Sequence, residues 1–199
     1  MKLYYTAGSC SLAIHIAFRE IGQPVELLAV DLRTKLIASG EDYRQINTKG
    51  YVPALRTDAG ALLTEVPAVL QYVADLKPAA GLAPANGTIA RDELQGWLSY
   101  INAELHKDFG PLFDPTASAD MKKYASAKLT RRFAWVAEHL ERSPYLMGDA
   151  FTVADAYLYV VLAWPAMVNV DLSALPSLSA YRARIAERPA VKAAHAAEQ

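Results

Sequence analysis

The feature that most constrains this chain is a change of pattern part-way along it. Short apolar runs alternate with helical patterns up to residue 77, and strand patterns stop after a segment rich in Pro, Ala and Gly at residues 77–87. Such a composition is typical of a linker between domains. We therefore predict an α/β domain over residues 1–78, a linker over residues 79–86 and an all-helical domain over residues 87–199.

The first part of the chain predicts strands and helices in the order βαβαββα. Strands are expected at residues 2–5, 25–30, 53–57 and 61–64, and helices at residues 11–20 and 67–76. The last two strands flank Asp58-Ala-Gly60, a turn signal that predicts a hairpin. Residues 35–46 carry a weak polar pattern that fits a helix or an irregular loop. A parallel βαβ unit followed by a hairpin and a helix predicts an α/β sandwich.

The second part of the chain predicts helices only. They are expected at residues 88–109, 120–141, 152–168 and 177–187. Because residues 152–168 are apolar on nearly all sides, this helix should be central and buried. Thr152 and Asp155 have the spacing of a capping box at its start, so we assign Asp155 a structural role. We also expect three tryptophans in the core, namely Trp97, Trp135 and Trp164.

Charge and hydropathy exclude several kinds of partner. The formal net charge is -1 and the Lys and Arg residues are scattered, so neither nucleic acid nor a membrane surface is an expected partner. No apolar run reaches the roughly 18 residues that span a bilayer. The N-terminus enters a strand rather than a signal peptide, and one cysteine allows no intrachain disulfide. A cytoplasmic location and a small or neutral partner are therefore expected.

The single cysteine is the first candidate for chemistry. Cys10 lies between a predicted strand and a predicted helix, and the free N–H groups and partial positive charge of a helix N-terminus stabilise a thiolate. We therefore expect the pKa of this thiol to fall. The residue three positions later is Ala13, so a redox cycle would need an external thiol. The alternative is a small buried residue that only packs.

Two loops carry backbone groups that a peptide could bind. A cis bond between Val52 and Pro53 would expose the backbone N–H and C=O of Val52 to an extended peptide, although the residues alone favour an ordinary trans proline. The N–H groups at Glu65 and Val66, where a strand joins a helix, could hold a carboxylate. Glu65 itself could pair with an ammonium group or only complement the helix dipole.

A third group lies on the long helix that opens the second part. Glu104, His106 and Lys107 could face a cleft between the two domains. The alternative is a helix face in contact with solvent, which composition alone favours. These residues do not establish a function by themselves, and no metal site is expected from them.

Taken together, these motifs resemble bacterial beta-class glutathione transferases from end to end. The residues that carry the resemblance are Met1-Lys-Leu-Tyr-Tyr5, Gly8-Ser-Cys-Ser-Leu12, Lys49-Gly-Tyr-Val-Pro-Ala-Leu55, Leu63-Thr-Glu65, Gln71-Tyr-Val-Ala-Asp75, Glu104-Leu-His-Lys107, Phe151-Thr-Val-Ala-Asp-Ala-Tyr157 and Ala186-Glu-Arg-Pro189. The resemblance implies a thioredoxin-like N-terminal domain, an all-helical C-terminal domain and a homodimer. It also implies glutathione as co-substrate, a small electrophile as the second substrate, and no permanently bound cofactor.

The resemblance assigns roles around the glutathione thiol. Cys10 would face the sulfur and could form a mixed disulfide with it, and His106 would lie near the thiol with Lys107 close by. Pro53 would be cis, so that the backbone of Val52 pairs with the cysteinyl part of glutathione.

The two ends of glutathione would be held by other residues. Lys35 would bind the glycine carboxylate, while Glu65 and the backbone of Val66 would hold the γ-glutamyl end. Relatives often carry a smaller or hydroxyl residue at position 66, so a hydroxyl contact is lost here. The stretch of the partner subunit that would reach the same end contains Ser99, Ala103 and Glu104. Two further hydroxyl donors rank below Cys10, namely Tyr5 and Ser9.

The expected reaction is attack of glutathione thiolate on an electrophile, as in detoxification, with possible thiol transfer through a Cys10 mixed disulfide. One alternative is a glutaredoxin-like exchange enzyme, which needs Cys10 for all turnover. Another is a non-catalytic ligand-binding protein on a transferase fold. The sequence does not distinguish conjugation, dechlorination and peroxide reduction, because the acceptor pocket depends on packing.

Overall fold

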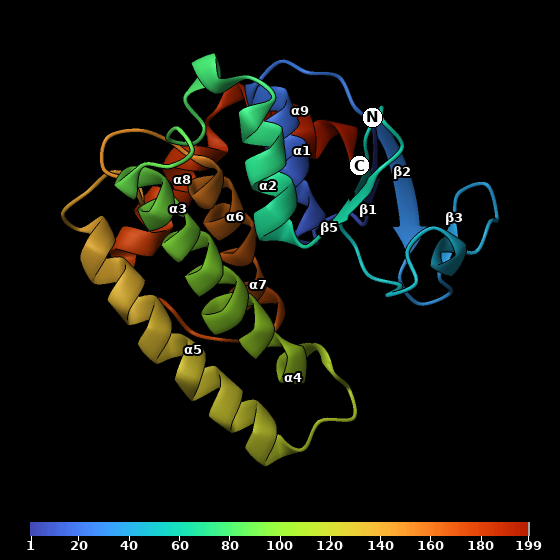
Figure 1. Ribbon diagram of the computed structural model, residues 1–199. Coiled ribbons are helices and arrows are strands. Elements are labelled where there is room, and N and C mark those ends of the chain that lie inside the picture. The colour runs from blue at the N-terminus through green and yellow to red at the C-terminus, as the bar shows by residue number, and fades with distance from the viewer. Residues whose placement is uncertain (199) are drawn as a thin grey trace.

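The computed structural model describes residues 1–198 and builds its N-terminal part around a mixed five-stranded sheet (Figure 1). The strands are β1 (Lys2–Tyr5), β2 (Glu26–Asp31), β3 (Leu36–Ile37), β4 (Ala54–Arg56) and β5 (Leu62–Thr64). Their order across the sheet is β3-β2-β1-β4-β5, with β1 and β2 parallel and the other pairs antiparallel. The βαβ unit and the hairpin are therefore confirmed.

Alternation along β1 separates the two faces of the sheet. Leu3 points into the large core that includes α1 (Ser11–Glu20) and α2 (Val66–Asp75), whereas Tyr4 points into a small cluster on the opposite face. The segment 35–46 contributes to that small cluster. It forms the short strand β3 and a 3-10 helix at Tyr43–Gln45, where the sequence had left a helix or a loop open.

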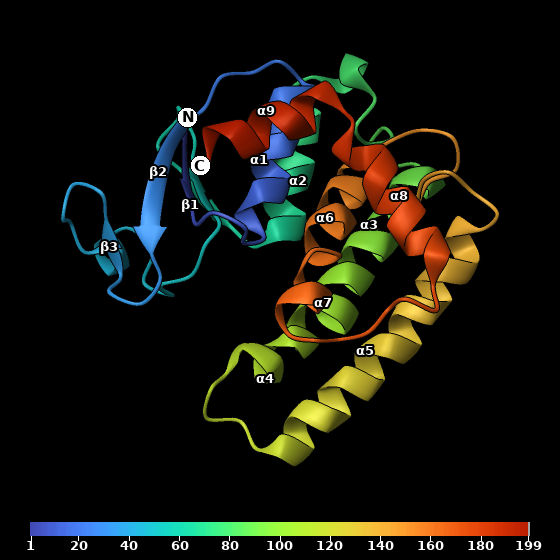
Figure 2. The same ribbon diagram turned by 180° about the vertical axis from the view of Figure 1, so that it is seen from behind.

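The C-terminal part is entirely helical, as expected (Figures 1 and 2). Its helices are α3 (Ile89–Tyr100), α4 (Gly110–Phe113), α5 (Ala119–Leu140), α6 (Val153–Val161), α7 (Trp164–Met167), α8 (Pro176–Ala186) and α9 (Pro189–Ala197). Every residue of α6 is buried, and the helix contacts α1, α2, α3 and α8. The fold class is confirmed: a thioredoxin-like sheet domain followed by a helical domain. The boundaries at residues 78 and 87 stay a prediction.

Two helices differ from the expected pattern. The predicted helix over residues 152–168 is divided into α6 and α7, because Pro165 has no N–H to continue the α6 hydrogen-bond ladder. The alanine-rich tail forms α9, which begins at Pro189 and packs on α1 (Figure 2). In both views the described chain ends beside the sheet domain, close to where it begins (Figures 1 and 2).

The start of α6 confirms the structural role of Asp155. Its buried carboxylate accepts hydrogen bonds from the Thr152 N–H and hydroxyl at 2.8 and 2.9 Å. It also accepts from the Leu146 N–H and the Tyr181 hydroxyl, each at 2.8 Å. One side chain therefore caps α6 and ties it to the preceding loop and to α8.

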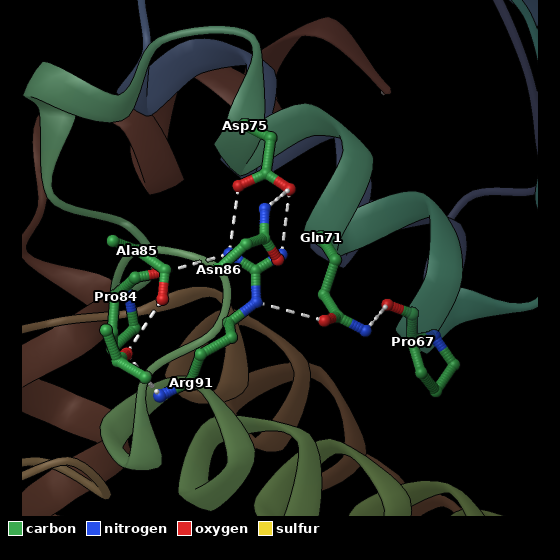
Figure 3. A network of polar contacts seen from close by, with 8 residues as sticks. Pro67, Gln71, Asp75, Pro84, Ala85, Asn86 and Arg91 are labelled. Atoms are coloured by element: carbon green, nitrogen blue, oxygen red, sulfur yellow. Dashed lines mark hydrogen bonds and ion pairs between the residues drawn. The ribbon is translucent and has the colours of Figure 1, made fainter.

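Arg91 of α3 joins the helical part to the sheet domain (Figure 3). Its guanidinium donates to both carboxylate oxygens of Asp75 at 2.9 and 2.8 Å, and to Gln71 Oε1 at 3.1 Å. It also donates to the Pro84 carbonyl at 2.9 Å. Arg91 is 2% exposed, whereas the Asp75 side chain is 41% exposed, so the network is shielded from water on the arginine side only.

Within residues 1–198, none of the helices combines the length and apolar character that crossing a bilayer requires.

Candidate functional site

A cavity of about 620 Å³ opens between the sheet domain and the helical domain. The sheet side supplies the loop before α1, the loop before β4 and the start of α2. The helical side supplies the end of the long α3 segment together with α4 and α7. The cavity lies at the carboxyl end of β1, where open α/β sheets commonly bind ligands.

Cys10 lies at the N-terminus of α1 and lines the cavity. Its Sγ is 3.6 Å from the carbonyl oxygen of Val52, to which the thiol can donate. Burial raises the pKa of the Cys10 thiol to about 12, although the N–H groups of Cys10 and Ser11 lower it. The expected fall in pKa is therefore wrong, because desolvation of the thiolate outweighs the helix N-terminus. Cys10 is a neutral hydrogen-bond donor.

The bond between Val52 and Pro53 is cis, as the resemblance implied and contrary to what the residues alone favoured. Both residues line the cavity beside Cys10. The preceding carbonyl, that of Tyr51, accepts hydrogen bonds from Tyr43 Oη at 2.9 Å and Asn47 Nδ2 at 2.8 Å. Both donors are buried, so the loop is held from behind.

The start of α2 forms the next part of the wall. Glu65 precedes the helix with φ of 69°, a left-handed conformation that is uncommon outside glycine. Its Oε1 lies 2.7 Å from Lys49 Nζ, which also donates to Thr64 Oγ1 at 3.1 Å. Val66 is the first residue of α2, so its N–H has no partner within the helix and can serve a carboxylate. Lys49 was not among the predicted site residues, although it belongs to the motif Lys49-Gly-Tyr-Val-Pro-Ala-Leu55.

His106 reaches the cavity from the helical side. The long helix expected over residues 88–109 changes after α3 into a π-helical turn at Ile101–Leu105 and a 3-10 turn at His106–Phe109. Such irregular turns are frequent at functional sites. His106 Nδ1 is 2.6 Å from Tyr157 Oη, and the Tyr157 hydroxyl donates to Asn102 Oδ1 at 3.1 Å. Burial, together with the charge of Lys107, lowers the pKa of His106 to about 4.

Aromatic side chains form the remaining wall. Phe109 and Phe113 lie with ring centroids 5.4 and 5.9 Å from that of Trp164, and Met167 completes the surface. Trp164 is buried as expected but also faces the cavity, whereas Trp135 is 50% exposed and not in the core. No local pattern identifies this wall, because α4 and α7 are far apart in the sequence.

Comparison with known proteins follows the division into a sheet domain and a helical domain. Residues 7–76 match the family model "Glutathione S-transferase, N-terminal domain", and residues 95–189 match "Glutathione S-transferase, C-terminal domain". The chain belongs to the glutathione S-transferase family. The sequence resemblance is thereby confirmed.

Individual members of the glutathione S-transferase family match along the whole chain. Glutathione S-transferase GstA of Escherichia coli O157:H7 is 44% identical over 198 residues, which covers 100% of this chain and 98% of that protein. The structure of the ternary complex of BphK, a bacterial transferase, is 53% identical in sequence with a TM-score of 0.98, and the match covers 100% of this chain and 99% of that one. A bacterial beta-class transferase from Sphingomonas chungbukensis is 46% identical in sequence with a TM-score of 0.97, and the match covers 100% of this chain and 98% of that one.

The cavity of this glutathione S-transferase family member brings together some of the residues that the sequence predicted. They are Ser9, Cys10, Val52, Pro53, Glu65, Val66, His106 and Lys107. Lys35 is not part of the wall: its Nζ donates to the Gly50 carbonyl at 3.0 Å and lies 5.7 Å from the Tyr51 ring centroid. Tyr5 is also outside the wall and packs against the core.

Three residues predicted to reach the site of the partner subunit are likewise absent from this chain's own cavity wall within residues 1–198, namely Ser99, Ala103 and Glu104. Ser99 and Ala103 are exposed, and Glu104 pairs with Arg132 of α5. Asn102 is the residue of this stretch that does line the cavity. Its position one helical turn before His106 is the signal that could have identified it.

Proposed function

We propose that this chain binds glutathione in the cavity and transfers its thiolate to electrophilic small molecules. One observation carries the proposal: a neutral thiol, the cis-proline loop and a helix N-terminus form the wall on the sheet side of the cavity, and aromatic side chains form the wall on its helical side. The first wall is complementary to a peptide with a thiol at its centre, and the second to an apolar acceptor. Glutathione is thus a co-substrate.

Along the first wall, the glutathione sulfur would lie beside Cys10 and the cysteinyl backbone beside Val52. The γ-glutamyl carboxylate would accept from the N–H of Val66, while its ammonium group pairs with Glu65. That ammonium would replace Lys49 at Glu65 and release Lys49 for a carboxylate. Lys35 would turn from Gly50 toward the glycine carboxylate.

Stabilisation of the glutathione thiolate favours conjugation over thiol exchange. The Cys10 thiol stays protonated because burial raises its pKa, so it donates a hydrogen bond to a neighbouring sulfur anion. A buried thiol of this kind is a poor nucleophile for forming a mixed disulfide, which requires the thiolate. Lys107 adds positive charge at the same end of the cavity. The acceptor would lie against Phe113 and Trp164.

We further propose a cytoplasmic homodimer. The outer face of α5 exposes apolar side chains that a second copy would cover: Met121 is 54% exposed, Tyr124 70% and Trp135 50%. Ser99 and Ala103, also exposed, would then reach the γ-glutamyl end of glutathione bound by the other subunit.

The test compares wild type, Cys10→Ser and Cys10→Ala in glutathione conjugation to a chloronitrobenzene, with calorimetric titration of glutathione. We expect a wild-type rate well above the uncatalysed reaction. Cys10→Ser should keep more activity than Cys10→Ala, because serine retains a donor. Binding of glutathione with no conjugation by wild type would contradict transferase activity, and activity limited to disulfide substrates would favour the exchange enzyme.

A further inference from the structure

A chain of three polar side chains closes the helical side of the cavity. Asn102 and His106 come from consecutive turns of the segment after α3, and Tyr157 comes from the middle of α6. Tyr157 is fully buried, and its oxygen lies 2.6 Å from His106 Nδ1 and 3.1 Å from Asn102 Oδ1. These three hydrogen-bonded side chains therefore reach from the buried centre of the helical domain to the cavity wall.

The chemistry of these groups determines which atom carries each proton. An amide oxygen only accepts hydrogen bonds, so the Tyr157 hydroxyl donates its single proton to Asn102 Oδ1. The Tyr157 oxygen can then only accept from His106, which means that His106 carries its proton on Nδ1. The lone pair of a neutral imidazole is consequently on Nε2.

Nε2 is the nitrogen that remains for a ligand. His106 lines the cavity, and no residue in the described range 1–198 forms a hydrogen bond with its Nε2. The ring is also held by Trp164, whose centroid is 4.7 Å away with the rings nearly perpendicular. The imidazole therefore has a defined orientation as well as a defined tautomer.

We infer that Tyr157 and Asn102 are positioning residues, which hold His106 in the Nδ1-protonated tautomer so that Nε2 accepts the proton of the glutathione thiol. The inference rests on the proposed function. In the step, the S–H bond breaks, sulfur keeps the electron pair and an N–H bond forms at Nε2. The proton passes to solvent or to the leaving group when the site is reset.

Burial and the charge of Lys107 oppose protonation of His106, and the charge of Glu65 favours it. The titratable groups that face it are Cys10 from α1, Glu65 before α2, its neighbour Lys107 and Tyr157 from α6. Because burial lowers the pKa of His106 to about 4, the resting imidazole is neutral and its Nε2 lone pair is free, but the ring is a weaker base than an exposed histidine and its protonated form is short-lived. Burial also raises the pKa of the Tyr157 hydroxyl, which keeps its proton for Asn102.

Two variants interrupt the series of hydrogen bonds from Asn102 through Tyr157 to His106 at different points. In Tyr157→Phe, Nδ1 loses its acceptor. In Asn102→Leu, the Tyr157 proton turns to Nδ1, which places the imidazole proton on Nε2, where it blocks proton transfer. Asn102→Asp retains an acceptor oxygen and is the conservative variant. Tyr159→Phe is the matched control, because this tyrosine of the same helix bonds to His195 Nε2 at 2.9 Å outside the cavity wall.

The readouts are the pH profile of kcat/KM, the thiolate absorbance of bound glutathione and the Kd of glutathione. We expect Tyr157→Phe and Asn102→Leu to lose about tenfold to a hundredfold in kcat/KM at neutral pH, with a smaller loss at alkaline pH and Kd changed less than about threefold. Asn102→Asp and Tyr159→Phe should stay within about threefold of wild type.

If both interrupting variants kept the wild-type pH profile and thiolate absorbance, the inference about Tyr157 and Asn102 would be overturned. Conjugation by wild type would still support the proposed function in that case. An equal loss in Asn102→Asp and Asn102→Leu would overturn it as well. Failure of wild type to bind glutathione would instead overturn the proposed function, and this inference with it.

Discussion

Trp164 Nε1 donates a hydrogen bond to the carbonyl oxygen of Gly8 at 3.0 Å, across 156 positions of the chain. Gly8 lies in the loop that ends at Cys10, and Trp164 begins α7. The bond therefore connects the aromatic wall of the cavity to the loop that presents the thiol. It also fixes the relative position of the two walls.

Removal of this donor should loosen the cavity. Trp164→Phe retains an aromatic ring but leaves the Gly8 carbonyl without its partner, so we expect the free energy of unfolding to fall by about 1–3 kcal/mol. The KM for the electrophile should rise more than the Kd for glutathione, because Trp164 belongs to the aromatic wall against which the electrophile would lie. Urea denaturation and steady-state kinetics measure both. Equal changes in the two constants would contradict the assignment of Trp164 to the acceptor wall.

Alkylation of Cys10 tests its raised pKa. Only the thiolate reacts with iodoacetamide, so the rate should keep rising with pH through 9 and show no plateau below about pH 11. Mass spectrometry of the intact protein follows the modification. The raised pKa also affects stability. Between about pH 9 and about pH 12 the thiol ionises in the unfolded chain but stays neutral in the folded protein, so the free energy of unfolding falls as the pH rises through this range. A plateau near neutral pH would show a stabilised thiolate instead.

Loss of the Arg91 network should destabilise the contact between the domains. Arg91→Ala leaves Asp75, Gln71 and the Pro84 carbonyl without their donor, and because the Asp75 carboxylate is accessible to water we expect a loss of about 1–3 kcal/mol in the free energy of unfolding. Arg91→Lys should recover only part of it, because an ammonium group cannot reproduce the planar fork. The exposed Arg142→Ala is the control and should change stability by less than about 0.5 kcal/mol. Similar losses in both alanine variants would argue against a specific network.

Asp155→Asn tests the cap of α6 with almost no change of shape. The substituted amide has one acceptor oxygen and introduces an NH2 group among donors, so we expect a loss of about 3–5 kcal/mol. Chemical denaturation measures the loss. The exposed Asp120→Asn in the first turn of α5 is the matched control and should be nearly neutral. If Asp155→Asn left the free energy of unfolding unchanged, the four donors would have found other partners.

Several elements could be predicted because their signals are local. Helix α1 ends before Gly22, the hairpin turns around Gly60 and the Thr152 box starts α6, each from residues within a few positions of one another. The segment 35–46 was left open because β3 depends on pairing with β2, a contact that composition does not encode. The split between α6 and α7 carried a local signal, Pro165, that the apolar pattern concealed.

The sequence by itself determined the family, the two-part fold and the identity of most candidate residues, since periodicity, turn chemistry and motif spacing are properties of neighbouring positions. Tertiary structure alone decided the state of those residues. The Cys10 pKa depends on how completely the folded chain excludes water, and the His106 tautomer on a tyrosine 51 positions away. The aromatic wall exists only where α4 and α7 meet, because burial and contacts between distant segments are created by folding.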